Sequence, residues 1–291
     1  MPVVIDKNLP AFAQLEGEGR HVLPKGDSKP RLKVTLVNLM PTKIQTETQF
    51  ARLLSHSPET VGLELVRMET HQSQNTDSGH IERFYKPSTW LYGNKPDGII
   101  VTGAPVELLE FEHVDYWEEL SRLLDWIPDN VKSSMFVCWG AQAAIYRYFG
   151  IGKKLLPKKL FGVFSHEICS QNHPITVGLS SGFAAPHSRY TENTRFDIES
   201  NPNLEVLCKS DKAGVLLSLA RKWQMFFISG HPEYDTGTLK NEYQRDRQKG
   251  LETAIPENYF VDNDPDGFVN NIWEQAGRIL YSNWLAHYVA R

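Results

Sequence analysis

Residues 133–150 read SSMFVCWGAQAAIYRYFG, a short apolar run that ends on Cys138 and leads into a helix-like segment. The run is typical of a strand that is buried on both faces of a parallel sheet. Gly140 lies two residues after the cysteine, where it permits a tight turn that a Cβ atom would obstruct. The helix predicted from Ala141 onward points its N-terminus at the sulfur, and the positive end of a helix favours a thiolate. The stretch therefore predicts a strand–nucleophile–helix turn, as in the serine elbow of hydrolases.

Further apolar runs lie on the N-terminal side of this stretch. We predict them as strands at 31–40, 61–69 and 97–105. A helix after the first run is predicted from the capping-box spacing of Thr42 and Gln45. A second predicted helix, before residue 133, has an apolar face made by Val114, Trp117, Leu120, Leu124 and Ile127. This alternation predicts an α/β fold with a doubly wound, mostly parallel sheet and helices on both faces.

Beyond residue 150 the pattern changes to shorter strands and ends in two helices. The strands are predicted at 162–169, 204–210, 214–220 and 223–230, and the helices after 238 and around 268–289. Residues 1–30 have weak periodicity and several Pro and Gly residues, so we predict an N-terminal arm that lies on the surface. No internal repeat or low-complexity linker interrupts the rest, which predicts one α/β domain over 31–291.

The composition excludes several classes of function. A net charge of −4, without basic runs interleaved with aromatic residues, argues against nucleic-acid binding. The N-terminus carries acidic residues where a signal peptide needs an apolar stretch, and no apolar run approaches the ~18 residues of a membrane span. Three scattered cysteines, Cys138, Cys169 and Cys208, form neither a disulfide framework nor a zinc motif. We therefore expect a cytoplasmic protein with free thiols.

A cysteine in a strand has a simpler interpretation, because free cysteine often packs as a small buried hydrophobe. That interpretation suits Cys169 and Cys208, which lie in predicted strands without a following glycine. For Cys138 the strand end, the turn and the helix all favour a nucleophile instead.

A nucleophilic thiol needs a base, and His231 is the best candidate among ten histidines. It follows an apolar strand in FFISGHPEYD, and Pro232 favours an extended conformation for it. Residues two apart in an extended segment point the same way, so Glu233 can orient the imidazole while the other ring nitrogen takes the thiol proton. Cys138, His231 and Glu233 are thus predicted as a catalytic triad. An ordinary loop after a strand, or a metal bound by His231 and Glu233, are alternatives; no third ligand has zinc-like spacing, so we predict no metal.

These motifs resemble those of known families. Cys-Trp-Gly-Ala-Gln at 138–142 and His-Pro-Glu at 231–233 are similar to Cys-x-Gly-x-Gln and His-x-Glu of class I glutamine amidotransferases, although Phe136 stands where those enzymes usually have glycine. The chain more closely resembles the homoserine O-acyltransferases of methionine biosynthesis, which share that fold. The resemblance covers nearly the whole chain, through NLMPTKIQTETQF, VTGAPVELLEF, FVCWGAQA, APHSRY, SGHPEYD, YF-x-x-NDP and NWL.

The resemblance implies acyl transfer from an acyl-coenzyme A to the hydroxyl of L-homoserine, with no bound cofactor and with a homodimer as the assembly. Cys138 would carry the acyl group between two half-reactions, which gives ping-pong kinetics. The backbone N–H of Trp139 and one from the Gly103–Ala104 turn, Ala104 above all, would form the oxyanion hole.

Substrate-binding positions of the family match Lys159, Ser188 and Arg245. Arg245 is suited to the homoserine carboxylate because its planar fork binds carboxylates through two hydrogen bonds. Without the resemblance, each of the three would be interpreted as a solvated surface residue.

Glu107, in VTGAPVELLEF, is predicted to select the acyl donor. The resembling enzymes have glutamate or glycine here, and the choice follows acetyl or succinyl donors. A glutamate fills volume that a succinyl chain needs and repels its carboxylate, so we predict acetyl-coenzyme A as the co-substrate. The alternatives are a homoserine O-succinyltransferase, a glutaminase that uses the same triad, and a non-catalytic sensor with a vestigial cysteine.

Overall fold

The computed structural model describes residues 2–73, 75–170 and 172–291. Its strands are β1 (Val3–Ile5), β2 (Val22–Pro24), β3 (Leu32–Val37), β4 (Val61–Arg67), β5 (Tyr85–Pro87), β6 (Gly98–Val101), β7 (Ser133–Val137), β8 (Lys154–Ile168), β9 (Phe183–Glu192), β10 (Glu205–Ser210), β11 (Gly214–Ala220) and β12 (Met225–Ile228). Its α-helices are α1 (Pro10–Gly17), α2 (Lys43–Leu54), α3 (Ser78–Phe84), α4 (Trp117–Asn130), α5 (Trp139–Phe149), α6 (Arg195–Glu199), α7 (Thr238–Gln248) and α8 (Glu274–Trp284).

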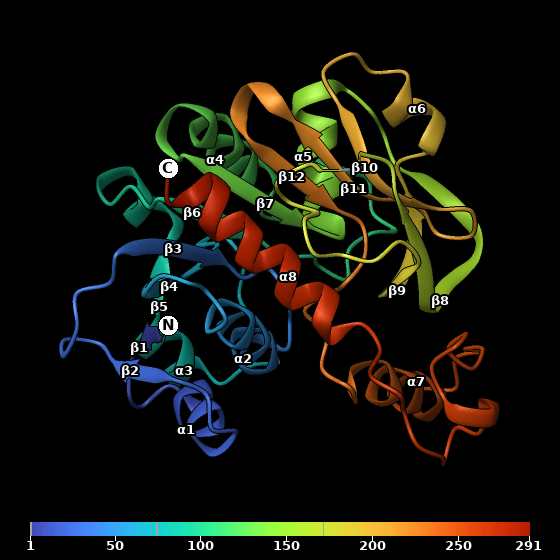
Figure 1. The fold of residues 1–291 in the computed structure, drawn as a ribbon, viewed down its shortest axis with the longest axis horizontal. Helices are drawn as coiled ribbons and strands as arrows, with labels where there is room; N and C mark the ends of the chain where they lie inside the picture. Colours follow the sequence, from blue (N-terminus) through green and yellow to red (C-terminus); the bar gives the residue numbers. More distant parts are fainter. Residues whose placement is uncertain (1, 74, 171) are drawn as a thin grey trace.

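The described strands form one mixed sheet in the order β2-β1-β4-β3-β6-β7-β12-β11-β10-β8-β9, with β5 paired to β4 (Figure 1). The part from β2 to β12 is parallel, whereas β11, β10, β8 and β9 pair antiparallel. Parallel strands all end at the same edge of the sheet, so the residues that follow β6, β7 and β12 are brought together there. The predicted α/β fold with a mostly parallel sheet is confirmed.

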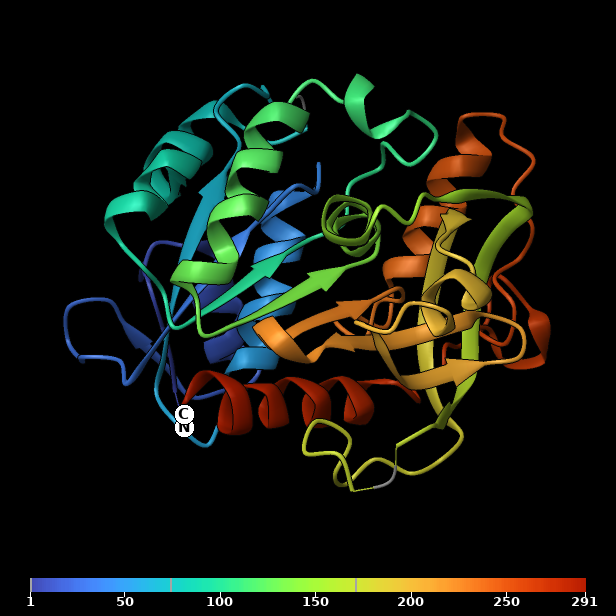
Figure 2. The same ribbon diagram turned by 90° about the horizontal axis from the view of Figure 1, so that it is seen from above.

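Helices cover both faces of the parallel part. Side chains alternate between the two faces along each strand, so apolar residues on both faces are buried against helices. Met135 and Val137 pack in one buried cluster with residues of α2 and α8, while Phe136 packs in another with residues of α4 and α5. Figure 2 shows α8 along one face of the sheet and α4 on the other. The continuous apolar run before Cys138 is therefore explained by burial on both sides.

The first half of the N-terminal segment is built into the fold and does not lie on the surface as the sequence suggested. Val3 and Val4 pair with β4 in the sheet and are buried, and Ala11 and Leu15 of α1 pack into the core. Three-residue strands are too short to show periodicity, and Pro and Gly around them obscured the pattern. The division of the chain at residue 30 stays a prediction.

Three smaller expectations also differ from the structure, and one strand was not expected. The Thr42 side chain makes no capping hydrogen bond; instead its carbonyl accepts the Thr46 hydroxyl at 3.1 Å. The last helix begins at Glu274 rather than near 268, and Ile272 is exposed. Cys169 is exposed beyond the end of β8, although Cys208 is buried as expected. Strand β9 was missed because FAAPHSRYTE mixes proline and charges into an otherwise ordinary strand.

Among the described residues, no helix is long and apolar enough to cross a membrane.

Candidate active site

Cys138 occupies the predicted elbow between β7 and α5. Its backbone has φ 51° and ψ −118°, a conformation that residues with a Cβ rarely adopt. Its N–H donates to Ile228 O at 2.7 Å, which fixes the elbow against β12, and the residue is only 7% exposed. Such strain persists only where the surrounding structure enforces it, and it is common at functional sites.

Two glycines let the neighbouring strand end approach the elbow. A Cβ on Gly140 would lie 2.4 Å from Thr102 O, so only glycine allows the start of α5 to pack on the end of β6. A Cβ on Gly103 would lie 3.1 Å from the Cys138 Cβ and 3.6 Å from Trp139 N. Gly140 is therefore needed because the start of α5 packs closely on the end of β6. The unusual backbone conformation of the elbow is taken by Cys138 itself.

His231 and Glu233 follow β12, the strand next to β7. The register pairs Ile228 with Val137, so both strands end level beside the cysteine. The His231 Nδ1 lies 2.7 Å from a Glu233 carboxylate oxygen, and the His231 N–H donates to Pro186 O at 2.8 Å. The imidazole also stacks on the Tyr234 ring at 4.0 Å between centroids. These contacts hold the ring in one orientation.

The electrostatic environment of His231 favours its charged form. Burial alone would lower the pKa of the imidazole, but the charges of Cys138 and Glu233 and hydrogen bonds to both outweigh burial and raise the pKa well above its ordinary value. The structure thus brings the three predicted triad residues together, with His231 hydrogen-bonded to both Cys138 and Glu233. Such an arrangement can carry an acyl group on sulfur and move a proton through the imidazole.

The start of α5 supplies N–H groups beside the sulfur. The N–H groups of Ala141 and Gln142 both donate to Cys138 O. The N–H of the first residue of a helix has no acceptor within the helix, and here that residue is Trp139. Trp139 N is therefore suited to an oxyanion, and Gly103 lies close to it. The assignment of the two donors to Trp139 and Ala104 stays a prediction.

Lys159, Ser188 and Arg245, predicted from the resemblance, gather around two acidic residues of α7. The Lys159 ammonium lies 2.7 Å from Glu242 and 3.0 Å from Asp246, and the Ser188 hydroxyl donates to Glu242 at 2.6 Å. The ion pairs outweigh the effect of burial and raise the pKa of Lys159. We name Lys159, Ser188, Glu242, Arg245 and Asp246 the polar cluster.

Arg245 lies at the rim of the polar cluster. Its guanidinium donates to Asp246 at 2.8 Å, and its side chain is 52% exposed. Glu242 and Asp246 were not predicted from the sequence. Their spacing of four residues places them on one face of α7, which was the available signal.

Glu107 points from the loop after β6 toward β9. Its carboxylate accepts the Tyr190 N–H at 3.0 Å, and burial raises its pKa even though Lys159, Arg189 and His231 act in the opposite direction. The charge of Glu107 is therefore within reach of both His231 and the polar cluster.

Arg189 was also missed, although it lies in the quoted APHSRY segment. It is 1% exposed and donates to Thr191 O at 2.9 Å and Ala213 O at 2.7 Å. Burial lowers its pKa, while the nearby charges of Glu192, Cys138 and Glu107 oppose that shift.

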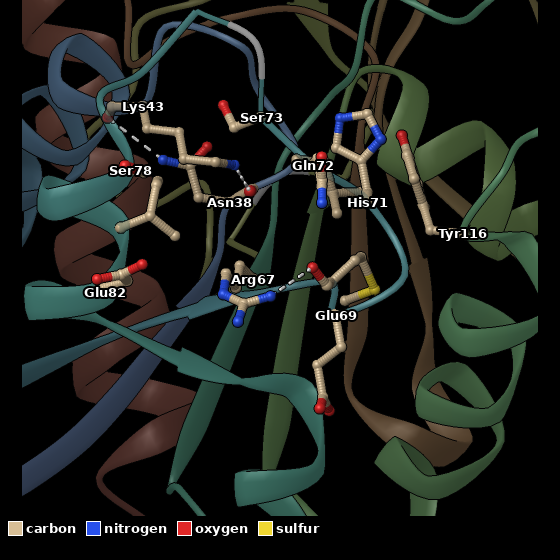
Figure 3. A pocket seen from close by; sticks show the side chains of 13 residues that line it. Asn38, Lys43, Arg67, Glu69, His71, Gln72, Ser73, Ser78, Glu82 and Tyr116 are labelled. Carbon is tan, nitrogen blue, oxygen red and sulfur yellow. Dashed lines mark hydrogen bonds between the residues drawn. The ribbon is translucent and has the colours of Figure 1, made fainter.

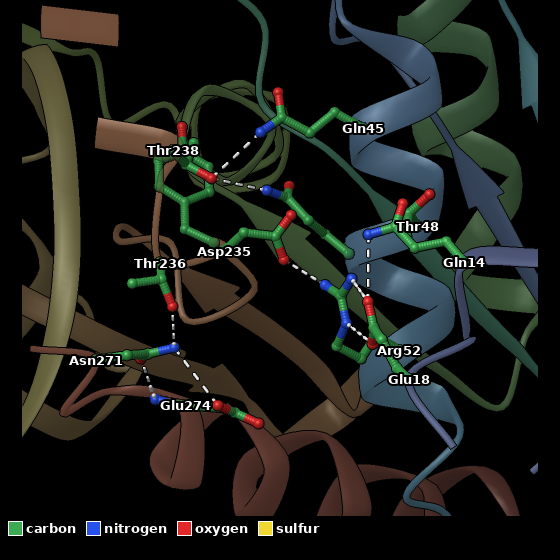
Figure 4. A network of polar contacts seen from close by, with 12 residues as sticks. Gln14, Glu18, Gln45, Thr48, Arg52, Asp235, Thr236, Thr238, Asn271 and Glu274 are labelled. Carbon is green, nitrogen blue, oxygen red and sulfur yellow. Dashed lines mark hydrogen bonds and ion pairs between the residues drawn. The ribbon is translucent and has the colours of Figure 1, made fainter. Parts of the chain in front are cut away.

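A network of polar contacts supports the chain just after the triad (Figure 4). Arg52 of α2 pairs with Asp235, two residues beyond Glu233, and with Glu18 at the end of α1 at 2.7 Å. On the other side, Trp273 Nε1 donates to Tyr234 O at 2.8 Å. The N-terminal and C-terminal parts of the chain therefore both position the loop that carries His231 and Glu233.

A cavity of about 410 Å³ opens at the carboxyl ends of β3 and β4 (Figure 3). In the strand order, β3 and β4 lie on the other side of β7 from β8 and β9, which carry Lys159 and Ser188 of the polar cluster. Arg67, His71, Glu82 and Tyr116 are among the residues that line it. Among the described residues, no group of three or more His, Cys, Asp or Glu side chains is placed to hold a metal ion.

Solved structures with the same fold are similar to this chain only in architecture. A glutamine amidotransferase from Thermotoga maritima matches with a TM-score of 0.56 and 9% identity, over 90% of this chain and 99% of that one. A glutamine amidotransferase from Methylobacillus flagellatus matches with a TM-score of 0.53 and 11% identity, over 88% and 94% of the chains. The predicted class I glutamine amidotransferase-like fold is confirmed.

Curated relatives are similar in sequence over their whole length. A homoserine O-acetyltransferase of Clostridium acetobutylicum is 46% identical over 99% of this chain and 97% of its own. Those of Acetivibrio thermocellus and Bacillus cereus are 45% and 44% identical over 99% of this chain, and over 96% and 97% of their own lengths. The family model described as homoserine O-succinyltransferase matches residues 2–291. The chain therefore belongs to the homoserine O-succinyltransferase family.

Proposed function

We propose that this protein transfers an acetyl group from acetyl-coenzyme A to the side-chain hydroxyl of L-homoserine, through a thioester on Cys138. The observation that carries the proposal is the strained Cys138, hydrogen-bonded to a His231 that Glu233 orients. The relatives suggest the substrates, because they are homoserine O-acetyltransferases.

In the first half-reaction the Cys138 thiolate attacks the thioester carbonyl of acetyl-coenzyme A. The carbonyl oxygen becomes an oxyanion that accepts hydrogen bonds from the backbone N–H groups of Trp139 and Ala104. The bond to the coenzyme A sulfur then breaks, and the His231 imidazolium gives its proton to the leaving thiolate. One carbon–sulfur bond replaces another, so the acyl-enzyme forms without a large energetic step.

In the second half-reaction neutral His231 takes the proton of the homoserine hydroxyl as its oxygen attacks the Cys138 thioester. The second oxyanion uses the same N–H groups, and its collapse breaks the carbon–sulfur bond. The products are O-acetylhomoserine and a thiolate that is again paired with the imidazolium. Protons balance over the cycle, because the one gained from homoserine replaces the one given to coenzyme A.

The polar cluster suits the charged end of homoserine. Glu242 and Asp246 offer carboxylates for an ammonium group, and the half-exposed Arg245 and the Lys159 ammonium offer cations for a carboxylate. Binding would exchange part of the internal pairing seen here for pairing with the substrate. We propose the same chemistry for Ser188, whose hydroxyl already donates to Glu242.

The proposal is tested by the release of coenzyme A from purified protein. With acetyl-coenzyme A alone, we expect about one equivalent per active site, and with L-homoserine added, continuous turnover to O-acetylhomoserine. Ammonia released from glutamine would instead favour a glutaminase, and no response to any of these substrates would favour a non-catalytic protein. We also propose a cytoplasmic homodimer, as the family resemblance implies; sedimentation tests the dimer.

Glu107→Gly is expected to change the preference of the protein between acetyl and succinyl donors. The glutamate carboxylate would meet the succinyl carboxylate in a partly buried site, where like charges cost a few kcal/mol. We expect the ratio of kcat/KM for succinyl- over acetyl-coenzyme A to rise by about a hundredfold. Glu110→Gly, an exposed change in the same loop, should leave the ratio unchanged. Equal rates with both donors in the unmodified protein would contradict the acetyl assignment and leave the triad unaffected.

A further inference from the structure

The cavity at the carboxyl ends of β3 and β4 is connected to the active site through short links. Leu39, in its wall, donates its N–H to Thr102 Oγ1 at 2.8 Å, and Gly103 next along the chain lies against Cys138. Tyr116, which also lines the cavity, packs edge-on against Trp139 at 6.1 Å between ring centroids. Two strand spacings of about 4.8 Å separate β3 from β7. The cavity is therefore adjacent to the nucleophile but distinct from its elbow.

The cavity holds two cations, and one of them, Arg67, is incompletely paired. Among the described residues, the Arg67 guanidinium makes a single hydrogen bond, to Met68 O at 3.3 Å. The Lys43 ammonium lies close by and donates to Asn38 O at 2.6 Å and to Met40 O at 3.3 Å. Burial and the charge of Arg67 lower the pKa of Lys43 to about 8, although Glu47 opposes the shift. Two like charges held together favour the binding of an anion between or beside them.

Two hydroxyl groups of the cavity wall are buried without a partner. Tyr116 Oη and Ser73 Oγ each have no hydrogen-bond partner among the described residues, and Tyr116 is 3% exposed. Leaving a buried polar group unpaired costs free energy, so such groups indicate a ligand or water that completes them. Figure 3 shows Arg67 and Glu82 on one side of the cavity and Tyr116 and His71 on the other.

We propose that this cavity binds the phosphorylated nucleotide end of the coenzyme A thioester, with Arg67 as the main phosphate ligand. The inference rests on the proposed function and adds the site where the donor is recognised. The volume of about 410 Å³ lies within the range of small-molecule sites. The flexible pantetheine arm, which is longer than two strand spacings, can then extend from the cavity to Cys138. Homoserine would use the polar cluster on the opposite side, so the two substrates would not compete for the same charges.

The test compares acetyl-coenzyme A with S-acetylpantetheine, which has the same thioester and arm but no nucleotide. Arg67→Gln should raise the KM for acetyl-coenzyme A by tenfold to about a hundredfold, because a charge-assisted hydrogen bond to phosphate is lost. The kcat, the KM for homoserine and the kinetics with S-acetylpantetheine should not change. Glu82→Gln removes a negative charge from the cavity, so it should lower the KM for acetyl-coenzyme A by about threefold.

Arg83→Gln is the matched control, because Arg83 is an exposed arginine of α3 that does not line the cavity. It should leave both donors unaffected. Equal effects of Arg67→Gln on both donors, or no effect on either, would overturn the inference. Calorimetric titration with adenosine 3′,5′-bisphosphate separates this inference from the proposed function, since the unmodified protein should bind it and Arg67→Gln should not, whether or not acyl transfer is observed. A lack of binding by the unmodified protein would also overturn it.

Discussion

Cys138→Ala is expected to lower acyl transfer by a factor on the order of 10⁴ to 10⁶, the range seen when other enzymes lose their nucleophile. No other thiol can replace it, because Cys208 is fully buried in β10 and Cys169 is exposed beyond the end of β8. Alanine keeps a Cβ and loses only the sulfur, so the fold should survive. Steady-state turnover with acetyl-coenzyme A and homoserine measures the loss, and a thermal melt confirms folding.

Cys169→Ala is the control for this prediction. It removes an exposed thiol outside the elbow, and turnover should remain close to that of the unmodified protein. Substantial turnover in a folded Cys138→Ala protein would mean that acyl transfer proceeds directly between the two substrates.

Glu233→Gln is expected to lower kcat by two to four orders of magnitude with little change in KM. The carboxylate accepts from His231 Nδ1 at 2.7 Å and so selects the tautomer whose other nitrogen acts as base. Glutamine can present its amide N–H to the same ring nitrogen and favour the wrong tautomer, as in other triads. The effect should appear in the acyl-transfer rate of a protein whose thermal melt is almost unchanged.

The same variant has a pH signature with a defined sign. In the acyl-enzyme the sulfur is esterified, so Glu233 is the remaining charge of the triad that raises the pKa of His231. Neutral His231 is the base for homoserine, hence deacylation rises with pH as the imidazolium loses its proton. Without Glu233 that pKa falls, and the acid limb of the single-turnover deacylation rate should move to lower pH. Glu16→Gln, which removes an exposed carboxylate, should leave the profile unchanged. An acid limb that does not move, with near-normal turnover, would show that another group orients the base.

The candidate catalytic residues could be proposed from the sequence because Cys138 and His231 each follow the end of a buried parallel strand. Apolar runs show where β7 and β12 end, and parallel strands end at a common edge, so Cys138 and His231 had to be near each other once the strands were adjacent. Glycine after the cysteine and proline after the histidine marked the turns. The apolar runs, the glycine and the proline are local signals, and local signals can be recognised in a sequence.

The remaining features depend on long-range contacts that no local pattern shows. Val3 joins β4 across more than fifty residues, and Arg189 is buried near the candidate active site although arginine is usually exposed. From the sequence, Glu242 is indistinguishable from a solvated helix residue. Its contacts with Lys159 and Ser188, which lie on antiparallel strands, exist only in the folded chain. The cavity beside β3 and β4 is likewise formed by side chains from several separate segments.

The proposed mechanism requires a covalent acyl group on Cys138, and mass spectrometry of the digested protein detects it. Incubation with acetyl-coenzyme A in the absence of homoserine should add one acetyl group to the peptide that contains Cys138. Addition of homoserine should then remove the label and yield O-acetylhomoserine in equal amount. A label on Cys169 or Cys208, or no label until homoserine is present, would contradict the account.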